Sequence, residues 1–445
     1  MNWRKPVIFA ALHLTGSKIP EYIKEIKYAS SLLPDKVAEY QEEKLERLLL
    51  QAYKHVPYYH RILPEAGVVL GDKVHLENFQ NIPILTKEII REEERNLYSD
   101  DCAQRSSYKN TSGGSTGEPV TFIQDKCYEE WNTATKLHVN GCLGKKIGDK
   151  EIKLWGSDRD IIVGSQTPKE NIINFIYHRK FFNSYILSQK KMEALIELNN
   201  RFQPDSYWSY ADSAVEVSKF ILASNETVNS PTFIMTTINP LHGNERNIIE
   251  KAFGCPCYDQ YGSREAGWIA CQNIDREEMY TFPWAHCVEI LHSDYANSPR
   301  NEGKIVVTTL NNYSMPLIRY DIGDVGISSK QQICKNGVNV ISLKKILGRS
   351  LGYFKKRDGT LMHAHYFVQT LYFKEWIKKF QVIQQDYEDI VLKIEKLFEP
   401  EESDLVEIST KIKLFMGNGC EVKFDFVDTI HPSKSGKYLY TICEI

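Results

Sequence analysis

Residues 111–119 read Thr-Ser-Gly-Gly-Ser-Thr-Gly-Glu-Pro, a composition that could enclose an oxyanion such as a phosphate group. Glycine adopts unusual backbone dihedrals that leave N–H groups free to face a ligand, and hydroxyl side chains add further hydrogen-bond donors. A β-prone run at 120–124 follows directly, so we expect a hairpin loop. The candidate contact residues are Ser112, Gly113, Gly114, Ser115, Thr116 and Gly117.

Two other motifs overlap this loop. Residues 113–117 match the G-x-S-x-G nucleophile elbow, with Ser115 as nucleophile, but an elbow runs from a strand into a helix, and here a strand-like run follows. A Walker phosphate loop needs Gly-Lys-Ser/Thr at the start of a helix, and residues 117–119 contain no lysine. A plain surface hairpin is the remaining alternative.

Three charged residues elsewhere stand in settings that suit phosphate or metal chemistry. Glu265 follows a strand-like segment, and its carboxylate could bind Mg²⁺, which prefers oxygen ligands. Asp324 follows a glycine in a predicted turn at 321–324, where an aspartate also commonly binds turn backbone. Lys437 lies in a predicted glycine-bearing loop before a final strand-like run, although lysines usually sit solvated at the surface.

The elements that position these residues alternate between strand and helix. Strand-like segments are expected at 152–155, 206–210, 232–237 and 256–260, and the intervening helices include one capped by Ser188. Such β-α-β alternation predicts a mainly parallel sheet covered by helices. Open sheets of this class bind ligands beyond the carboxyl ends of their strands, which here carry Trp155, Gly156, Tyr210 and 261–265.

The chain of 445 residues is long enough for two or three domains. A helix over 37–52 leads into a large α/β domain, which we place at 1–348 and which ends in a strand-rich subdomain. Beyond it, strands at 380–384, 390–394 and 421–427 with a helix over 404–416 predict a small α+β domain at 349–445.

Composition excludes several functions and locations. The net charge of -3 and the absence of long basic runs argue against nucleic acid as a partner. Ten cysteines without a C-x-x-C pair favour a reducing cytoplasm over a disulfide framework, and no zinc site is assigned. The apolar segment 7–14 lacks a cleavage site, and no run is long enough to span a bilayer.

Four stretches in this order resemble the adenylate-forming superfamily of acyl-CoA ligases and related adenylation domains. They are 111–119, 261–265, 319–324 with Gly348-Arg349, and Ser435-Gly-Lys437. The chain is most similar to the branch of phenylacetate-CoA ligase and its relatives from capsular polysaccharide gene clusters, as indicated by 82–87, 154–157 and 253–256.

The resemblance implies that ATP and an organic acid give an acyl-adenylate and pyrophosphate with Mg²⁺, in a role that includes polysaccharide biosynthesis. It makes 1–348 an adenylation domain and 349–445 a mobile lid that carries the catalytic Lys437. It also assigns the loop at 112–117 to the β- and γ-phosphates, Tyr261, Gly262 and Ser263 to the adenine side, Asp324 to the ribose hydroxyls, Arg349 to ribose or phosphate, and Glu265 to catalysis and Mg²⁺.

Several alternatives stay open at this point. The acyl acceptor is either the thiol of coenzyme A or an amine, and neither the acid nor the oligomeric state is determined. The substrate pocket is expected at Trp155, Gly156, Tyr210 and Trp268, with an apolar or aromatic lining. Relatives have an aspartate hinge where 350–352 read Ser-Leu-Gly, which leaves open a non-catalytic nucleotide-binding or partner-binding protein, and a hydrolase built on Ser115 is a third hypothesis.

Overall fold

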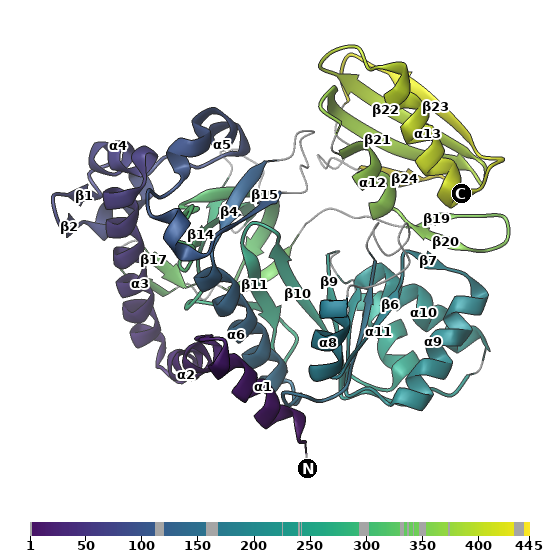
Figure 1. The fold of residues 1–445 in the computed structure, drawn as a ribbon, viewed down its shortest axis with the longest axis horizontal. Coiled ribbons are helices and arrows are strands. Elements are labelled where there is room, and N and C mark those ends of the chain that lie inside the picture. The colour runs from purple at the N-terminus through teal and green to yellow at the C-terminus, as the bar shows by residue number, and fades with distance from the viewer. Residues whose placement is uncertain are drawn as a thin grey trace. The chain divides into compact units, whose positions relative to one another are not determined.

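The computed structural model describes residues 2–111, 120–156, 168–224, 226–238, 241, 243–292, 302–329, 333–335, 338–340, 342–346, 353–372, 374–430 and 440–445. Contacts divide the chain into two compact units (Figure 1). Apart from the undescribed residues, the first unit contains the chain up to residue 147 together with 258–348, and the second contains 148–257 and 349–445.

The first unit begins with helices. Three of them start with proline in their first turn, where the ring fits helical geometry and the missing N–H has no helical partner. The predicted helix over 37–52 is confirmed and is longer, and it buries Leu45, Leu48, Leu49 and Ala52 at helical spacing. The helices are α1 (Arg4–Leu14), α2 (Ile19–Ser30), α3 (Pro34–His55) and α4 (Pro57–Glu65).

Antiparallel strands form the rest of the first unit and confirm the predicted strand-rich region. Their order is β13-β14-β15-β18-β12-β11-β10. Side chains such as Ile305, Val307 and Ile269 are fully buried in the core that this sheet shares with α3. The strands are β10 (Cys257–Ser263), β11 (Gly267–Gln272), β12 (Met279–Thr281), β13 (His286–His292), β14 (Glu302–Thr309), β15 (Tyr320–Ser328) and β18 (Ser342–Ile346).

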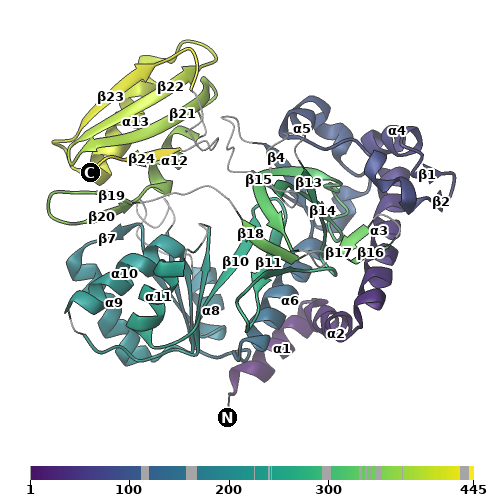
Figure 2. The same cartoon turned by 180° about the vertical axis from the view of Figure 1, so that it is seen from behind.

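The second unit contains the predicted parallel sheet, in the order β9-β8-β5-β6. Ile152, Leu154 and Tyr207 pack from one face against three helices (Figure 2). Ser188 caps the helix at Gln189–Phe202 as predicted, because its hydroxyl accepts a hydrogen bond from Lys191 N. The elements are β5 (Glu151–Trp155), β6 (Arg179–Asn183), α9 (Gln189–Phe202), β8 (Ser206–Tyr210), α10 (Ala211–Ser224), β9 (Phe233–Thr237) and α11 (Gly243–Phe253), with α8 (Pro168–Ile176) between β5 and β6.

The carboxyl-terminal residues of the second unit form a four-stranded sheet with a helix, as the strand and helix patterns predict. The strand order is β23-β22-β21-β24, with one antiparallel and two parallel pairs. In the part of the chain that the structure describes, no helix is long and apolar enough to cross a membrane. The elements are α12 (His365–Tyr372), β21 (Ile377–Asp386), β22 (Asp389–Lys396), α13 (Glu402–Met416), β23 (Glu421–Phe426) and β24 (Thr441–Cys443).

Candidate active site

Two paired strands enter and leave the glycine-rich stretch. They are β3 (Tyr108–Thr111) and β4 (Thr121–Gln124), and their antiparallel register places Thr111 opposite Thr121. The strand predicted after the stretch is therefore confirmed, and this contradicts a nucleophile elbow, which would continue as a helix. The six candidate phosphate-binding residues, 112–117, lie outside the described part of the chain.

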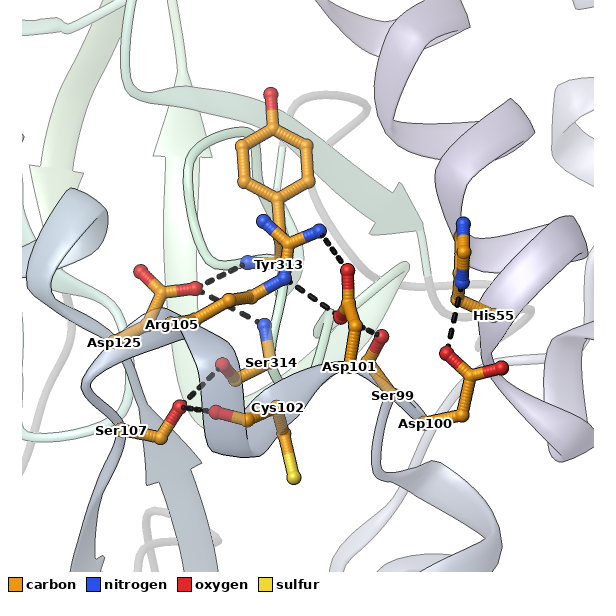
Figure 3. Close-up of polar contacts among 10 residues, drawn as sticks. All are labelled: His55, Ser99, Asp100, Asp101, Cys102, Arg105, Ser107, Asp125, Tyr313 and Ser314. Atoms are coloured by element: carbon orange, nitrogen blue, oxygen red, sulfur yellow. Dashed lines mark hydrogen bonds and ion pairs between the residues drawn. The ribbon is translucent and has the colours of Figure 1, made fainter.

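Asp125 anchors the end of this strand pair (Figure 3). Its Oδ1 accepts from the main-chain N of Tyr128 at 2.9 Å and so caps α6 (Lys126–Cys142). Its Oδ2 accepts from the main-chain N of Tyr313 and Ser314 at 2.9 and 3.0 Å. The carboxylate is fully buried and cannot be hydrated, so these three N–H groups supply the hydrogen bonds that water would otherwise donate. One side chain thus joins β4, α6 and the connection between β14 and β15.

The chain that enters β3 is fixed to the same connection. Ser107 Oγ lies 2.6 Å from Ser314 Oγ and also donates to Cys102 O. Next to it, Arg105 Nε donates to Asp101 at 2.7 Å, and the guanidinium lies over the Tyr313 ring (Figure 3). This ion pair lowers the pKa of Asp101 to about 2. Both strands of the pair are therefore held on one rigid base.

Replacing Asp125 with alanine should lower the free energy of unfolding by about 3 kcal/mol, since hydrogen bonds to a charged acceptor contribute about 1.5–3 kcal/mol each and do not add fully. Urea unfolding measures the change. As a control, Asp101→Ala removes a half-buried carboxylate in the same region and should cost less. Equal effects of the two substitutions would contradict the anchoring role of Asp125.

Glu265 lies in the turn between β10 and β11, and only 8% of it is exposed. Its main-chain oxygen accepts from Gln124 Nε2 at 3.2 Å and from Tyr128 Oη at 3.4 Å. Its carboxylate Oε1 accepts from Tyr320 Oη at 3.4 Å. The turn that carries Glu265 is thus held directly against the base of the glycine-rich hairpin, through β4 and α6.

Tyr261 and Asp324 are neighbours in the first unit. Tyr261 Oη donates to Asp324 Oδ2 at 2.9 Å. Tyr261, Gly262 and Ser263 lie within β10, which continues beyond the predicted strand at 256–260. Gly262 allows a close strand approach, because a Cβ there would meet the main-chain oxygen of Gly267 at 2.1 Å.

The predicted turn at 321–324 is wrong, because these residues belong to β15. The register shifts there, so that Lys304 pairs with Val325 while Val306 pairs with Asp321. The extra residues form a bulge, in which Gly323 has φ +84° and donates its N–H to Asp321 Oδ1. A bulge redirects a side chain within a strand, and here it presents Asp324 to Tyr261.

Arg319 lies directly before β15, which begins at Tyr320. This buried arginine has φ +51°, which a regular strand excludes. Its Nε donates to Glu289 Oε2 at 3.0 Å and its Nη1 donates to Ile82 O at 2.6 Å. Burial raises the pKa of Glu289, and the charge of Arg319 opposes that rise. Through these hydrogen bonds, Arg319 connects the segment around Ile82 to the start of β15.

Trp268 lies on β11 and lines a small cavity of about 10 Å³ between β11 and α6. A cavity of this size holds one water-sized group. His286 also lines it; its Nε2 lies 2.9 Å from Trp268 O, and burial lowers the pKa of His286 to about 4. The imidazole is therefore neutral at pH 7, and the cavity that Trp268 lines is too small for an organic acid.

The second unit holds the other predicted pocket residues, at the carboxyl ends of β5 and β8. The rings of Trp155 and Tyr210 lie 4.3 Å apart, and Tyr210 Oη donates to Gly156 O at 3.4 Å. Gly156 has to be glycine, because a Cβ there would lie 1.8 Å from the Tyr185 ring. Trp155, Gly156 and Tyr210 thus form one aromatic cluster, as the topology predicts.

Comparisons with known proteins agree with this geometry. Residues 355–444 match the family model of the CapK C-terminal domain. Protein CapK of Staphylococcus aureus is 22% identical over 435 residues, covering 96% of this chain and 92% of CapK. Phenylacetate-coenzyme A ligase of Thermus thermophilus is 23% identical over 330 residues, covering 71% of each chain. The chain is therefore similar to adenylate-forming, acyl-CoA ligase-like proteins over most of its length.

The fold of this chain is also similar to that of a solved ligase. A structure of 2-hydroxyisobutyryl-CoA ligase with an acyl-adenylate and coenzyme A aligns with a TM-score of 0.59, at 16% identity, over 93% of this chain and 91% of the ligase. The structure brings Tyr261, Glu265 and Asp324 onto two connected elements of the first unit. Trp155, Gly156 and Tyr210 are grouped in the second unit, while Arg349, Lys437 and the altered hinge at 350–352 lie outside the described residues.

Sequence reasoning missed the residues that support these side chains in the adenylate-forming fold. Asp125, Gln124 and Tyr128 follow the glycine-rich hairpin, and Tyr320 precedes the Asp324 bulge. Asp125 had a recognisable signal, since an aspartate before an amphipathic run is a strong helix N-cap. No sequence signal predicted the contacts of Gln124 and Tyr320 with Glu265. Each of these contacts joins residues more than fifty positions apart in the chain.

Proposed function

We propose that this protein activates an organic acid as its acyl-adenylate and then transfers the acyl group to a thiol or an amine. In the first step a carboxylate oxygen attacks the α-phosphorus of ATP, and pyrophosphate leaves. In the second step the acceptor attacks the acyl carbon, AMP leaves and the acceptor proton passes to solvent. Coenzyme A is the acceptor that the ligase relatives favour. The observation that carries the proposal is the joining of the Glu265 turn to the base of the glycine-rich hairpin.

Each site residue has a role in this reaction. The hairpin residues 112–117 bind the β- and γ-phosphates, and Arg349 contacts ribose or phosphate. Tyr261, Gly262 and Ser263 border the adenine, and Asp324 accepts from the ribose hydroxyls. Lys437, on a lid formed by 349–445, offsets the charge that develops during adenylation. Trp155, Gly156 and Tyr210 border the acid.

Glu265 has the chemistry to hold Mg²⁺ with the nucleotide. Mg²⁺ keeps several waters and takes one or two carboxylates together with substrate phosphates, so a single carboxylate beside a phosphate loop is a suitable donor. Among the described residues, the Glu265 carboxylate accepts one side-chain hydrogen bond, a long one of 3.4 Å from Tyr320 Oη. The ion would supply neutralisation of phosphate charge, and the residues around Glu265 would orient its carboxylate.

AMP release from ATP in the presence of an acid panel tests the proposal, with coenzyme A or an amine present or absent. Acid-dependent AMP release that increases with coenzyme A supports the thioester, and an increase with an amine supports the amide. ATP binding without AMP release or pyrophosphate exchange would instead support the non-catalytic alternative. Ester turnover without ATP, with covalent labelling of Ser115, would support a hydrolase.

Replacing Glu265 with glutamine should raise the Mg²⁺ concentration needed for half-maximal pyrophosphate exchange by roughly ten-fold or more, because the amide keeps the shape but loses the charge. A Mg²⁺ titration of the exchange rate measures this shift. Tyr320→Phe is the matched control, since it removes the contact to Glu265 Oε1 and leaves the carboxylate. The same Mg²⁺ dependence in wild type and Glu265→Gln would show that Glu265 is not a metal ligand.

A further inference from the structure

Lys153 is a charged residue inside the aromatic cluster of the second unit. It lies on β5 two residues before Trp155, so both side chains leave the same face of the sheet. Its cross-strand neighbour on β8 is Trp208. Lys153 Nζ lies 4.3 Å from the centre of the Trp155 ring and 4.8 Å from that of Trp208. The two ring centres are 5.6 Å apart, so the ammonium group lies over both neighbouring indole rings.

No described anion pairs with this ammonium group. Glu151, the nearest carboxylate on the strand, forms its ion pair with Arg179 Nε at 2.5 Å. Burial, together with the nearby charge of Arg179, lowers the pKa of Lys153 to about 8, and Glu151 only partly opposes this shift. The two rings offer cation–π attraction, which recovers part of the cost of burying the charge.

A purely structural role would not need a cation here. The stem of Lys153 covers apolar surface between the indoles, but leucine or methionine would fill that space without a desolvation cost. The cluster also lies at the carboxyl ends of parallel strands, where sheets of this class bind ligands. A partly exposed ammonium at such a place, without a described partner, suits a ligand that brings the missing negative charge.

We propose that Lys153, held over the rings of Trp155 and Trp208, binds an oxyanion of a small-molecule substrate. Two sources share this chemistry: a second carboxylate on the acid, or a phosphate on the acceptor, as in coenzyme A. The identity of the ligand rests on the proposed function, whereas anion binding at Lys153 does not. Lys153 is thus a residue that determines which acid or acceptor is used, and it takes no part in bond breaking.

The test compares wild type with Lys153→Met, which keeps the stem and removes the charge. One arm measures AMP release with dicarboxylic acids and with monocarboxylic acids of equal length. The other arm compares coenzyme A with 3′-dephospho-coenzyme A. Lys153→Met should raise KM roughly ten- to a hundred-fold for the dicarboxylic acid alone or for coenzyme A alone, with kcat little changed. A higher KM in the first arm identifies the anion as a carboxylate of the acid, and a higher KM in the second arm identifies it as a phosphate of coenzyme A.

Lys150→Met is the matched control, because Lys150 lies just before the same strand and stacks over Phe202 at 5.6 Å, away from the cluster. It should leave both arms unchanged. Unchanged KM values in a folded Lys153→Met protein would overturn the proposal.

A second measurement tests anion binding at Lys153 independently of the proposed reaction. Acetic anhydride labels unprotonated amines, so Lys153 should react faster than Lys150 at pH 8. Inorganic phosphate or a dicarboxylate should protect Lys153 selectively, without any need for turnover. Absence of AMP release together with protection would reject the reaction and keep the anion site. Labelling that neither anion slows would reject the site.

Discussion

The Lys437→Ala protein is expected to lose adenylate formation by at least about a hundred- to a thousand-fold, the usual consequence of removing a preorganised electrostatic contact to a transition state. Lys437 closes the Ser-Gly-Lys triplet that resembles the carboxyl-terminal lysine motif of the superfamily. An ammonium group delivered by a closing domain neutralises charge that exists fully only in the transition state, so substrate affinity should change much less than rate. Pyrophosphate exchange measures the adenylation step alone.

Transfer from a supplied acyl-adenylate should survive the same substitution, because Lys437 acts on the phosphate chemistry of the first step. AMP release from a synthetic acyl-adenylate and coenzyme A measures this second step. Lys434→Ala is a close control, since it removes a lysine from the same segment three residues earlier. If adenylation and transfer fall together, or if Lys434→Ala has the effect of Lys437→Ala, the assignment of Lys437 to the first step alone is wrong.

The Asp324→Ala protein is expected to bind ATP at least about a hundred-fold more weakly, measured by calorimetry. A carboxylate that accepts from two ribose hydroxyls contributes about 1.5–3 kcal/mol for each hydrogen bond, and a tenfold change in affinity corresponds to about 1.4 kcal/mol. The strand bulge around Gly323 presents this carboxylate next to Tyr261, which donates to it at 2.9 Å.

The Tyr261→Phe substitution tests whether ATP binding depends on the charge of Asp324 or on the hydrogen bond that holds Asp324 in position. It removes the hydroxyl that contacts Asp324 Oδ2 and leaves the carboxylate available to ribose. We expect a change of only a few-fold in ATP affinity, together with an unchanged preference for ATP over 2′-deoxy-ATP. Wild-type ATP affinity in Asp324→Ala would remove Asp324 from the ribose site, and a loss in Tyr261→Phe as large as that in Asp324→Ala would make the tyrosine the main determinant.

Most of the elements that local sequence patterns predicted are present in the structure, because hydrophobic periodicity and capping act over a few residues. The strands of the parallel sheet, the helix capped by Ser188 and the carboxyl-terminal strands all lie close to their predicted positions. The motifs also indicated the superfamily, since their order along the chain is far more specific than any one of them.

The sequence by itself determined the fold class, the elements and the chemical types of the site residues. Only the tertiary structure decided their surroundings: that Asp324 lies on a bulge next to Tyr261, that Gln124 and Tyr128 hold the Glu265 turn, and that Lys153 lies over two indole rings. The physical reason is register. A strand's own sequence specifies which face a side chain leaves, whereas the neighbour it meets depends on the pairing of strands far apart in the chain.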